Sequence, residues 1–411
     1  MSDEAIETPP PNSRWATTVG AICDKFGGEI QTGPFGSQLH ASDYSEDGTP
    51  VVMPQDMKDG QVVCDRIARV DTAHVQRLQR HELRVGDVIF SRRGDVARFA
   101  IVTESESGWL CGTGSIRIRL NSPDICIGYV RRYLQQRSVG KWLEHNAKGQ
   151  TMPNLNTDII RALPFVYPPL LEQQRIAAIL DHADALRAKR RAALAKLDAL
   201  PQAIFGEMFG DPVTNPKGWP TSSVGDQLVF QLYGPRFYNE VYSTNGVRIV
   251  RITDLDEFGR LDFAAMPRLI VAAEDLEKYS LRAGDILFAR TGATVGKVAL
   301  IGPDAPVCIA GAYFIVMRFG PAIDPAYARA VLTTPKIQDI VQVRSKQSAQ
   351  QNFSGPGLRA LPMPLPPLPL QQEFAKRVAA VERVRSAHRA SLVQLDALFA
   401  SLQYRAFRGE L

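Results

Sequence analysis

A repeat at a fixed offset of 198 residues is the feature that most constrains how this chain can fold. The stretch LPFVYPPLLEQQRIAAIL begins at Leu163, and the similar stretch LPMPLPPLPLQQEFAKRV begins at Leu361. GDVIFSRRG, which begins at Gly86, returns as GDILFARTG from Gly284 at the same offset. A solenoid would repeat every ~20 to 50 residues, whereas a period this long indicates a duplicated domain with its connector. We therefore expect two copies of one module, related by approximate twofold symmetry.

Each copy changes its hydrophobic period at the repeated junction. Before the junction, short runs alternate apolar and polar residues, as in SIRIRL from Ser115, which is typical of strands bounded by Gly and Asp turns. Helical stretches such as GYVRRYLQQRSVGKWLEHNAK lie among them. After the junction, apolar residues step by threes and fours from Ile176 to Met208, which predicts one long helix. The predicted fold class is α+β, with two tandem mixed domains each followed by a long helix.

The two long helices are predicted to pair with each other. A helix from Leu171 to Phe209 would be about 58 Å long, too long to bury its apolar stripe on one compact domain. Its own repeat is the natural partner, which predicts an antiparallel coiled coil with pseudo-twofold symmetry. The Pro-Pro steps in YPPL and LPPL would end each domain with a stiff turn that aims the helix. The predicted ranges are a flexible tail (1–13), a first domain (14–169), a first helix (170–210), a second domain (211–367) and a second helix (368–411).

Composition and charge favour a cytoplasmic protein. The five cysteines are scattered and form no C-x-x-C pair, which argues against a disulfide framework and a zinc ribbon. MSDEAIETPP does not resemble a signal peptide, and no uninterrupted apolar run reaches ~18 residues, so we expect no membrane association. The chain has 48 basic and 43 acidic residues. This mild excess fits an anionic partner but does not establish one.

Several stretches resemble catalytic motifs but lack parts that the chemistry needs. GATVGKV has neither the spacing nor the hydroxyl of a phosphate-binding loop, and CGTGS continues into a strand where a dinucleotide site would have a helix. Asp43 with Asp56 and Lys58 loosely resembles a nuclease site, but the second copy loses the lysine, so we expect a solvated loop there. The six histidines show neither a metal-ligand pair nor a triad. We expect no catalytic, metal-binding or cofactor-binding residues in this chain.

Polar loops that recur in both copies are the better candidates for function. Arg92 and Arg93 follow a predicted strand, Arg290 and Thr291 occupy the equivalent place, and Lys148-Gly149-Gln150-Thr151 pairs with Lys346-Gln347-Ser348. Arg, Lys, Gln, Ser and Thr side chains contact phosphates and read base edges, and two binding modules on a rigid connector suit double-stranded DNA. The predicted DNA-binding residues are Ser37, Gln38, Arg92, Arg93, Lys148, Gln150, Thr151, Arg236, Arg290, Thr291, Lys346 and Gln347.

The order and duplication of these stretches resemble one known family. GPFGSQL, the pair GDVIFSRRG and GDILFARTG, LPFVYPPLLEQQRIA and FGDPVTNPKGW look like the specificity subunit of type I restriction-modification systems, and the resemblance covers nearly the whole chain. It implies a non-catalytic subunit in which each domain reads one half of a split DNA target and the helices set the spacer. It also implies two methylation subunits as partners and, in complexes that restrict, two restriction and translocation subunits. S-adenosylmethionine, ATP and magnesium would then be held by those partners.

Two departures from the family pattern lie in the second copy, and other functions stay open. Leu370 stands where the first copy has Glu172, and Gly234-Pro235-Arg236-Phe237 replaces GPFGS. A coiled-coil scaffold with two protein-binding end modules would also explain the repeat and the helices. A stand-alone nuclease or methyltransferase ranks third. Binding that weakens steeply with salt would favour DNA over the scaffold, because DNA binding releases counterions.

Overall fold

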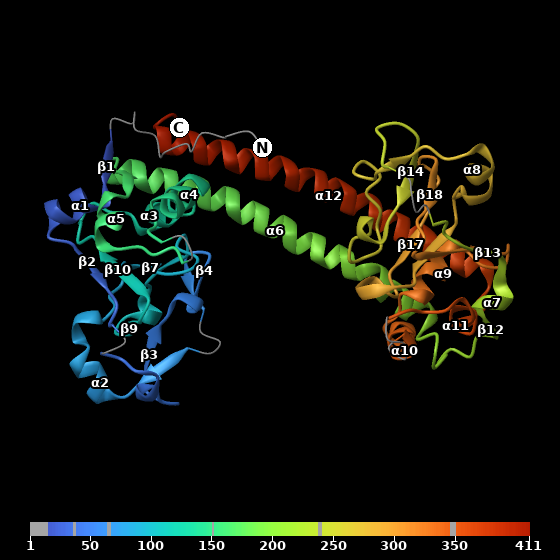
Figure 1. Cartoon of the computed structure of the whole chain (residues 1–411), viewed down its shortest axis with the longest axis horizontal. Coiled ribbons are helices and arrows are strands. Elements are labelled where there is room, and N and C mark those ends of the chain that lie inside the picture. The colour runs from blue at the N-terminus through green and yellow to red at the C-terminus, as the bar shows by residue number, and fades with distance from the viewer. Residues whose placement is uncertain (1–14, 36–37, 64–66, 150–151, 237–240, 346–350) are drawn as a thin grey trace. The chain divides into compact units, whose positions relative to one another are not determined.

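The computed structural model describes residues 15–35, 38–63, 67–149, 152–236, 241–345 and 351–411. The chain divides into two units. Unit 1 combines Met1–Lys189 with Val393–Leu411, and unit 2 is Arg190–Leu392. Each unit therefore contains one β-rich domain together with parts of both long helices (Figure 1).

A four-stranded antiparallel sheet forms the centre of unit 1. Its strands, in spatial order, are β2 (Glu29–Thr32), β10 (Ser115–Arg119), β7 (Val88–Ser91) and β8 (Phe99–Ile101). Ile116 lies opposite Phe90 and Ile118 opposite Val88, and all four side chains are buried in one core. The alternation predicted for SIRIRL is thus confirmed. Arg117 lies on the other face of β10 but is only 2% exposed, because a second apolar layer covers that face.

Smaller sheets and short helices complete unit 1. β3 (Thr49–Val52) pairs antiparallel with β6 (Ala68–Val70) and parallel with β9 (Leu110–Cys111). β4 (Met57–Lys58) pairs with β5 (Gln61–Val62), and β1 (Ala16–Thr18) pairs with β11 (Pro164–Val166), which joins the start of the domain to its end. The helices are α1 (Val19–Phe26), α2 (Thr72–Arg77), α3 (Ile127–Leu134), α4 (Arg137–Asn146) and α5 (Thr157–Ala162).

Unit 2 repeats this topology. Its four-stranded sheet has the order β13 (Leu228–Tyr233), β19 (Phe314–Phe319), β16 (Ile286–Ala289) and β17 (Val298–Leu300). The other strands are β15 (Arg268–Leu269), β14 (Val247–Val250) and β18 (Cys308–Ala310) in one sheet, and β12 (Thr221–Ser223) with β20 (Pro362–Pro364) in another. The short helices are α7 (Val224–Gln227), α8 (Ala273–Tyr279), α9 (Pro325–Leu332), α10 (Pro335–Ser345) and α11 (Gly355–Arg359). The prediction of two tandem α+β domains is confirmed.

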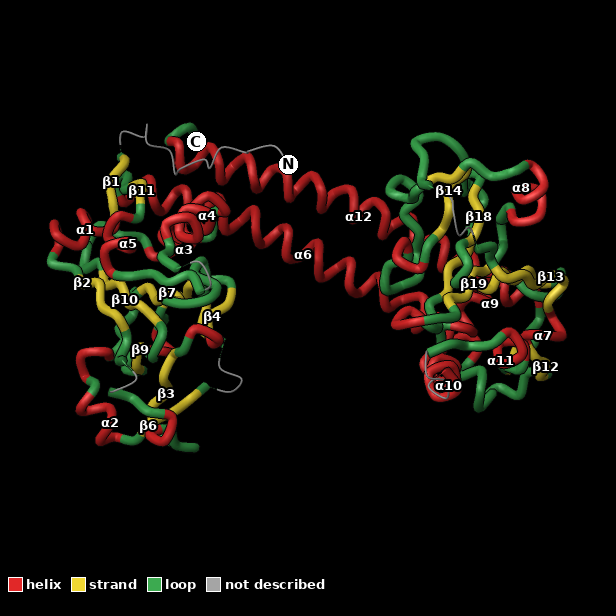
Figure 2. The backbone as a smooth tube through the Cα atoms, viewed as in Figure 1, coloured by secondary structure: helices red, strands yellow, loops and turns green. Residues whose placement is uncertain are grey.

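The long helices α6 (Leu170–Phe209) and α12 (Leu368–Arg408) run in opposite directions within each unit (Figure 2). In unit 1, Phe407 near the end of α12 shares a core with Ile176 near the start of α6. In unit 2, Phe209 at the end of α6 shares a core with Phe374 near the start of α12. The predicted antiparallel pairing is therefore present in both units. None of the helices in the described part of the chain is long and apolar enough to cross a membrane.

A buried glutamine fixes the first turn of each long helix to its domain. The amide of Gln173 donates to the carbonyls of Asp124 (3.0 Å) and Pro168 (2.8 Å), and its Oε1 accepts from the Cys126 N–H (2.9 Å). Gln371 makes the same three kinds of contact in unit 2. Both side chains are almost fully buried, at 0% and 1% exposure. The junction thus joins the proline turn, the helix and the loop before α3 or α9 through one side chain.

Candidate nucleic-acid interface

The loop after β7 is held against the segment before α5, with Arg92 between them. The Arg92 N–H donates to the carbonyl of Gly114 (2.7 Å), and its carbonyl accepts from the Leu155 N–H (2.9 Å). The side chain is held as well, because Nε donates to Oδ1 of Asn154 at 3.3 Å. The guanidinium lies 5.7 Å from the centre of the Phe35 ring. Arg92 is therefore half-buried and fixed at both its backbone and its Nε atom.

The same arrangement recurs in unit 2. The Arg290 N–H donates to the carbonyl of Tyr313 (2.9 Å), and the Arg290 carbonyl accepts from Phe353 (2.8 Å). Nε of Arg290 donates to Oδ1 of Asn352 at 3.2 Å, and the guanidinium lies 4.7 Å from the centre of the Tyr233 ring. We call Phe35, Arg92 and Asn154 the first clamp, and Tyr233, Arg290 and Asn352 the second clamp. The members of the two clamps are 198 residues apart, pair by pair.

Glycines explain why the ring-bearing segments come so close to the sheets. A Cβ on Gly33 would lie 2.0 Å from the carbonyl oxygen of Gly112, and a Cβ on Gly234 would lie 2.0 Å from that of Gly311. No side chain fits at either position, so the two backbones can approach only with glycine there. Phe35 follows its glycine by two residues, whereas Tyr233 precedes its glycine by one. The ring thus reaches the guanidinium by a different local path in each unit.

The structure gathers several other predicted residues around the clamps. Lys148 is exposed, and its backbone exchanges two hydrogen bonds with that of Asn154 (3.0 and 2.9 Å). Arg93 is exposed, and its backbone forms an isolated antiparallel β-bridge with Asn154. Thr291 forms the same kind of bridge with Asn352. Gln38 is exposed and accepts a hydrogen bond from the Phe35 N–H at 3.1 Å.

The remaining predicted residues are less well placed. Arg236 is exposed and follows Tyr233 by three residues. Ser37, Gln150, Thr151, Lys346 and Gln347 lie outside the described residues. DNA contact by any of the twelve residues stays a prediction. The asparagines and aromatic residues of the two clamps were not predicted as site residues. Their shared offset of 198 residues could have indicated them.

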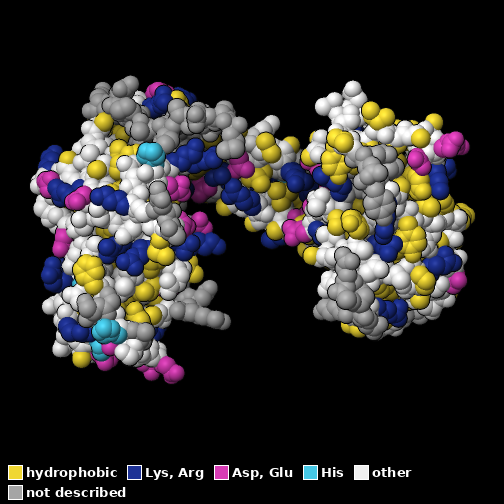
Figure 3. Space-filling model, in the orientation of Figure 1, with side chains coloured by type: hydrophobic (Ala, Val, Ile, Leu, Met, Phe, Trp, Pro, Cys, Tyr) yellow, Lys and Arg dark blue, Asp and Glu magenta, His cyan; other side chains and the backbone are white. Residues whose placement is uncertain are grey.

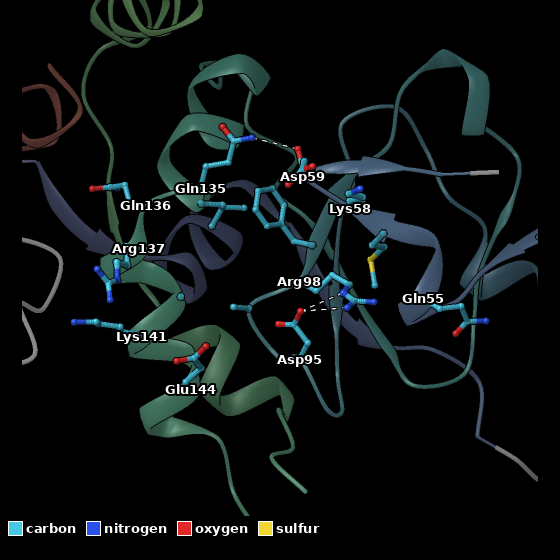
Figure 4. Close-up of a pocket in the computed structure, with 16 residues that line it drawn as sticks. Gln55, Lys58, Asp59, Asp95, Arg98, Gln135, Gln136, Arg137, Lys141 and Glu144 are labelled. Atoms are coloured by element: carbon cyan, nitrogen blue, oxygen red, sulfur yellow. Dashed lines mark hydrogen bonds and ion pairs between the residues drawn. The ribbon is translucent and has the colours of Figure 1, made fainter. Parts of the chain in front are cut away.

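Unit 1 also has a polar groove of about 790 Å³ (Figure 4). Its walls are the β4–β5 hairpin, the end of the loop after β7, and α4. Figure 4 shows Arg98 paired with Asp95 (3.3 Å) on one side, and Gln135 donating to the Asp59 carbonyl (3.2 Å) on another. The charged side chains that line the groove are Lys58, Asp59, Asp95, Arg98, Arg137, Lys141 and Glu144.

Two single-residue differences alter this region in unit 2. Gln338 donates to the carbonyl of Gly296 (2.9 Å) and Gln342 to that of Val295 (3.1 Å), so α10 is tied to the loop after β16. The equivalent positions in the first copy are Gly140 and Glu144. Sequence reasoning missed the groove because its shape depends on these side chains rather than on any motif.

The carboxylates that loosely resembled a nuclease site have structural partners. Oδ2 of Asp56 accepts from the Met53 N–H (2.9 Å) and caps a turn, and burial raises the pKa of this carboxyl. Asp43 caps a turn in the same way by accepting from His40, and this backbone hydrogen bond lowers the pKa of Asp43. Asp56 is only 7% exposed, so the expectation of a solvated loop is wrong for this residue. Among the described residues, no three His, Cys, Asp or Glu side chains are grouped so that they could hold a metal ion.

Comparison with known proteins gives one consistent result. The family model described as "Type I restriction modification DNA specificity domain" matches residues 43–196 and 216–395, once in each copy of the repeat. The chain is 25% identical over 305 residues to the EcoBI specificity subunit of Escherichia coli, covering 65% of this chain and 62% of that protein. It is 23% identical over 314 residues to the EcoKI specificity subunit of Escherichia coli K12, covering 69% and 65%. The aligned part thus spans less than two thirds of either relative.

Solved structures show the same fold over nearly the whole chain. A chain from a study of complex assembly and conformational transition in a type I restriction-modification system has a TM-score of 0.61 at 18% identity, covering 98% of this chain and 99% of that one. The type I restriction-modification S subunit from M. genitalium has a TM-score of 0.57 at 13% identity, covering 97% of both chains. At these identities the likeness shows the fold alone.

Proposed function

Because this chain belongs to the type I restriction modification DNA specificity family, we propose that it is the DNA-recognition subunit of a type I restriction-modification complex. Each β-rich domain would read one half of a bipartite target, and the paired helices would set the spacer between the halves. The observation that carries the proposal is the pair of clamps, which present a held guanidinium in the same place in both domains. A double-stranded polymer offers the same backbone chemistry at each half-site, which suits such a duplicated group.

The charges around the clamps support DNA as the ligand. Arg92, Arg93 and Lys148 all adjoin Asn154 in unit 1 through side-chain or backbone contacts. Figure 3 shows Lys and Arg side chains in several groups on the visible face of unit 1, with Asp and Glu side chains among them. Grouped cations of this kind neutralise phosphates and so contribute most of the affinity for a DNA backbone. Loop side chains near them would then add base contacts that differ between the domains.

We infer that the chemistry belongs to partner subunits. Two methylation subunits would bind this chain, joined in restricting complexes by two restriction and translocation subunits. S-adenosylmethionine, ATP and magnesium would be bound by these partners, and the complex would act in the cytoplasm. Asp43 and Asp56 each cap a turn, and this structural role supports the proposal that the chain itself is non-catalytic.

The test is to sequence methylated bases in cells that produce the methylation subunit with and without this chain. We expect methylation at one bipartite motif with a fixed spacer, and no such motif when this chain is omitted. The purified complex should bind a duplex that carries the motif, with an affinity that falls steeply as salt rises. Methylation without a bipartite motif would contradict the proposal, and binding that is insensitive to sequence and salt would favour the protein-binding scaffold.

A further inference from the structure

We propose that Arg92 and Arg290 bind the same element in both half-sites, a phosphate of the DNA backbone, and that Asn154 and Asn352 position them for it. The inference rests on the proposed function, since it assigns a role within the same interface. In each domain, the residues that bind the DNA backbone would then differ from the residues that contact the bases.

The clamps are alike in the two domains, whereas a neighbouring loop residue differs. Each clamp has an aromatic ring, an arginine and an asparagine, whereas the adjacent Arg93 of the first loop is replaced by Thr291 in the second. A side chain that reads a base has to differ between domains that read different bases. Phosphates are identical in every half-site, so a phosphate contact can be the same in both domains. The duplicated clamps therefore fit the common element of the target.

The asparagine of each clamp contacts one nitrogen of the arginine guanidinium. In both clamps Oδ1 of the asparagine accepts a hydrogen bond from the arginine Nε–H, with an N–O distance of 3.3 Å for Arg92 and 3.2 Å for Arg290. Within the described residues, the terminal amino groups of these two arginines make no hydrogen bond to protein atoms. The two amino groups form a fork that matches two oxygens of one phosphate, and the fixed Nε reduces the entropy lost on binding. The asparagines are thus positioning residues that need not touch DNA.

Asn154 also positions a second cationic residue. Lys148 exchanges its backbone N–H and carbonyl with those of Asn154, so the lysine and Arg92 are both anchored to one residue. A phosphate has enough acceptor oxygens for two cationic donors. A base edge takes one bidentate side chain and has less use for a second positive charge. This pairing favours backbone contact over base reading.

The test uses the complete complex with its methylation subunits and duplexes that carry the motif or a single base-pair change in it. We expect Arg92→Ala and Arg290→Ala each to weaken binding about tenfold on every duplex, with the preference between duplexes unchanged. The slope of log affinity against log salt should fall by about 1 for each variant and about 2 for the double variant. Arg80→Ala, which removes an exposed guanidinium outside the clamps, is the matched control and should leave the slope unchanged.

Asn154→Ala tests the positioning role. We expect a smaller loss than for Arg92→Ala, and no added loss when the two changes are combined, because both act through one contact. Arg92→Lys keeps the charge but has no Nε–H for Asn154, so it should retain the salt slope and still lose affinity.

Three outcomes are distinguishable. Loss of discrimination at one base pair in Arg92→Ala would overturn the proposal and make this arginine a base reader. A lower unfolding temperature with wild-type affinity and salt slope would overturn it in favour of a structural contact. Failure of the wild-type complex to prefer any bipartite duplex would instead refute the proposed function.

Discussion

At the scale of single residues, Arg117 and His81 form a buried polar site beneath the sheet of the first domain. Arg117 is 2% exposed, and its guanidinium donates to Gln31 Oε1 (2.8 Å) and to the Glu82 carbonyl (2.9 Å). His81 is 8% exposed, and its Nδ1 has no hydrogen-bond partner among the described residues. Burial lowers the pKa of His81, and the charges of Arg117 and Arg80 lower it further, while Glu29 opposes them.

This lowered pKa predicts that the first unit loses stability in mild acid. The unfolded chain takes up a proton on His81 near its ordinary pKa of about 6.5, whereas the folded chain takes it up at lower pH. The unfolded state therefore binds more protons as the pH falls from about 7 to 5, and the free energy of unfolding decreases. Urea unfolding at pH 7, 6 and 5 should show a smaller decrease for His81→Gln than for wild type. Equal decreases in the two proteins would contradict the assignment.

Sequence alone located the arginines of the site but not what holds them. Arg92 and Arg290 stood out because they follow equivalent strands, and the asparagines shared the same offset. The hydrogen bonds between them depend on a loop that folds back over 62 residues, which no local pattern encodes. Asp56 was expected to be solvated because it is a polar residue in a turn. Its carboxylate instead accepts a hydrogen bond from the Met53 N–H, which allows the side chain to be buried.

At the scale of elements, the buried glutamines explain how a domain fixes the direction of its long helix. Gln173 and its exposed neighbour Gln174 form a matched pair, because both lie in the first turn of α6. Gln173→Ala removes three hydrogen bonds, one from the Cys126 N–H and two to the carbonyls of Asp124 and Pro168. We expect the free energy of unfolding to fall by about 3 kcal/mol, whereas Gln174→Ala should change it by less than about 0.5 kcal/mol. Denaturant unfolding measures both, and similar values for the two variants would show that the contact does not stabilise the junction.

The long helices were the elements best predicted from sequence, and the short strands the least. The apolar steps from Ile176 to Met208 continue for many turns, so their period is unambiguous, and α6 runs through Pro201 without ending. A single proline removes one N–H from a helix whose other contacts remain. The hairpin of Met57–Lys58 and Gln61–Val62 has only two residues in each strand, too few for any alternation to be visible. Such strands form because the neighbouring sheet offers them hydrogen bonds and apolar contacts.

At the scale of the whole molecule, ion pairs specify which turns of the long helices face each other. In unit 1, Nε of Arg187 on α6 lies 2.6 Å from Oδ1 of Asp396 on α12. In unit 2, Arg260 from the second domain contacts Asp198 on α6 (2.7 Å) and Glu382 on α12 (3.4 Å). Polar contacts in a helix pair disfavour a shift of register, because a shift would separate the charges. Within each unit these ion pairs therefore favour one register of the two helices.

The proposed role of the helices in setting the spacer predicts how the DNA target would change if the helices were shortened. Residues 191–194 and 389–392 are equivalent, with the sequences RAAL and RASL. Deleting both segments should shorten each helix by about 6 Å, which corresponds to about two base pairs of DNA. Sequencing of methylated sites should then show the same half-sites with a spacer shorter by one or two base pairs. An unchanged spacer would show that the helices do not set it.

The repeat allowed the tandem organisation to be predicted, but linear ranges could not show that the end of the chain completes the first domain. Gln403 on α12 donates to the Arg132 carbonyl across 271 residues of sequence. Phe407 packs against Tyr129 and Tyr133, as Phe209 packs against Tyr327 in the other unit. No composition change or turn signal marks such a contact, because both partners look like ordinary core residues.

The burial of Phe407 also affects the order in which the two units can complete their cores during synthesis. Unit 2 is one continuous segment, Arg190–Leu392, so its core is complete once that segment has emerged. Unit 1 begins first but lacks Ala406 and Phe407 until the residues that follow unit 2 have been made, and until then Tyr129, Tyr133 and Phe165 lack a neighbour. The unit that begins first along the chain is therefore the unit whose core is completed last.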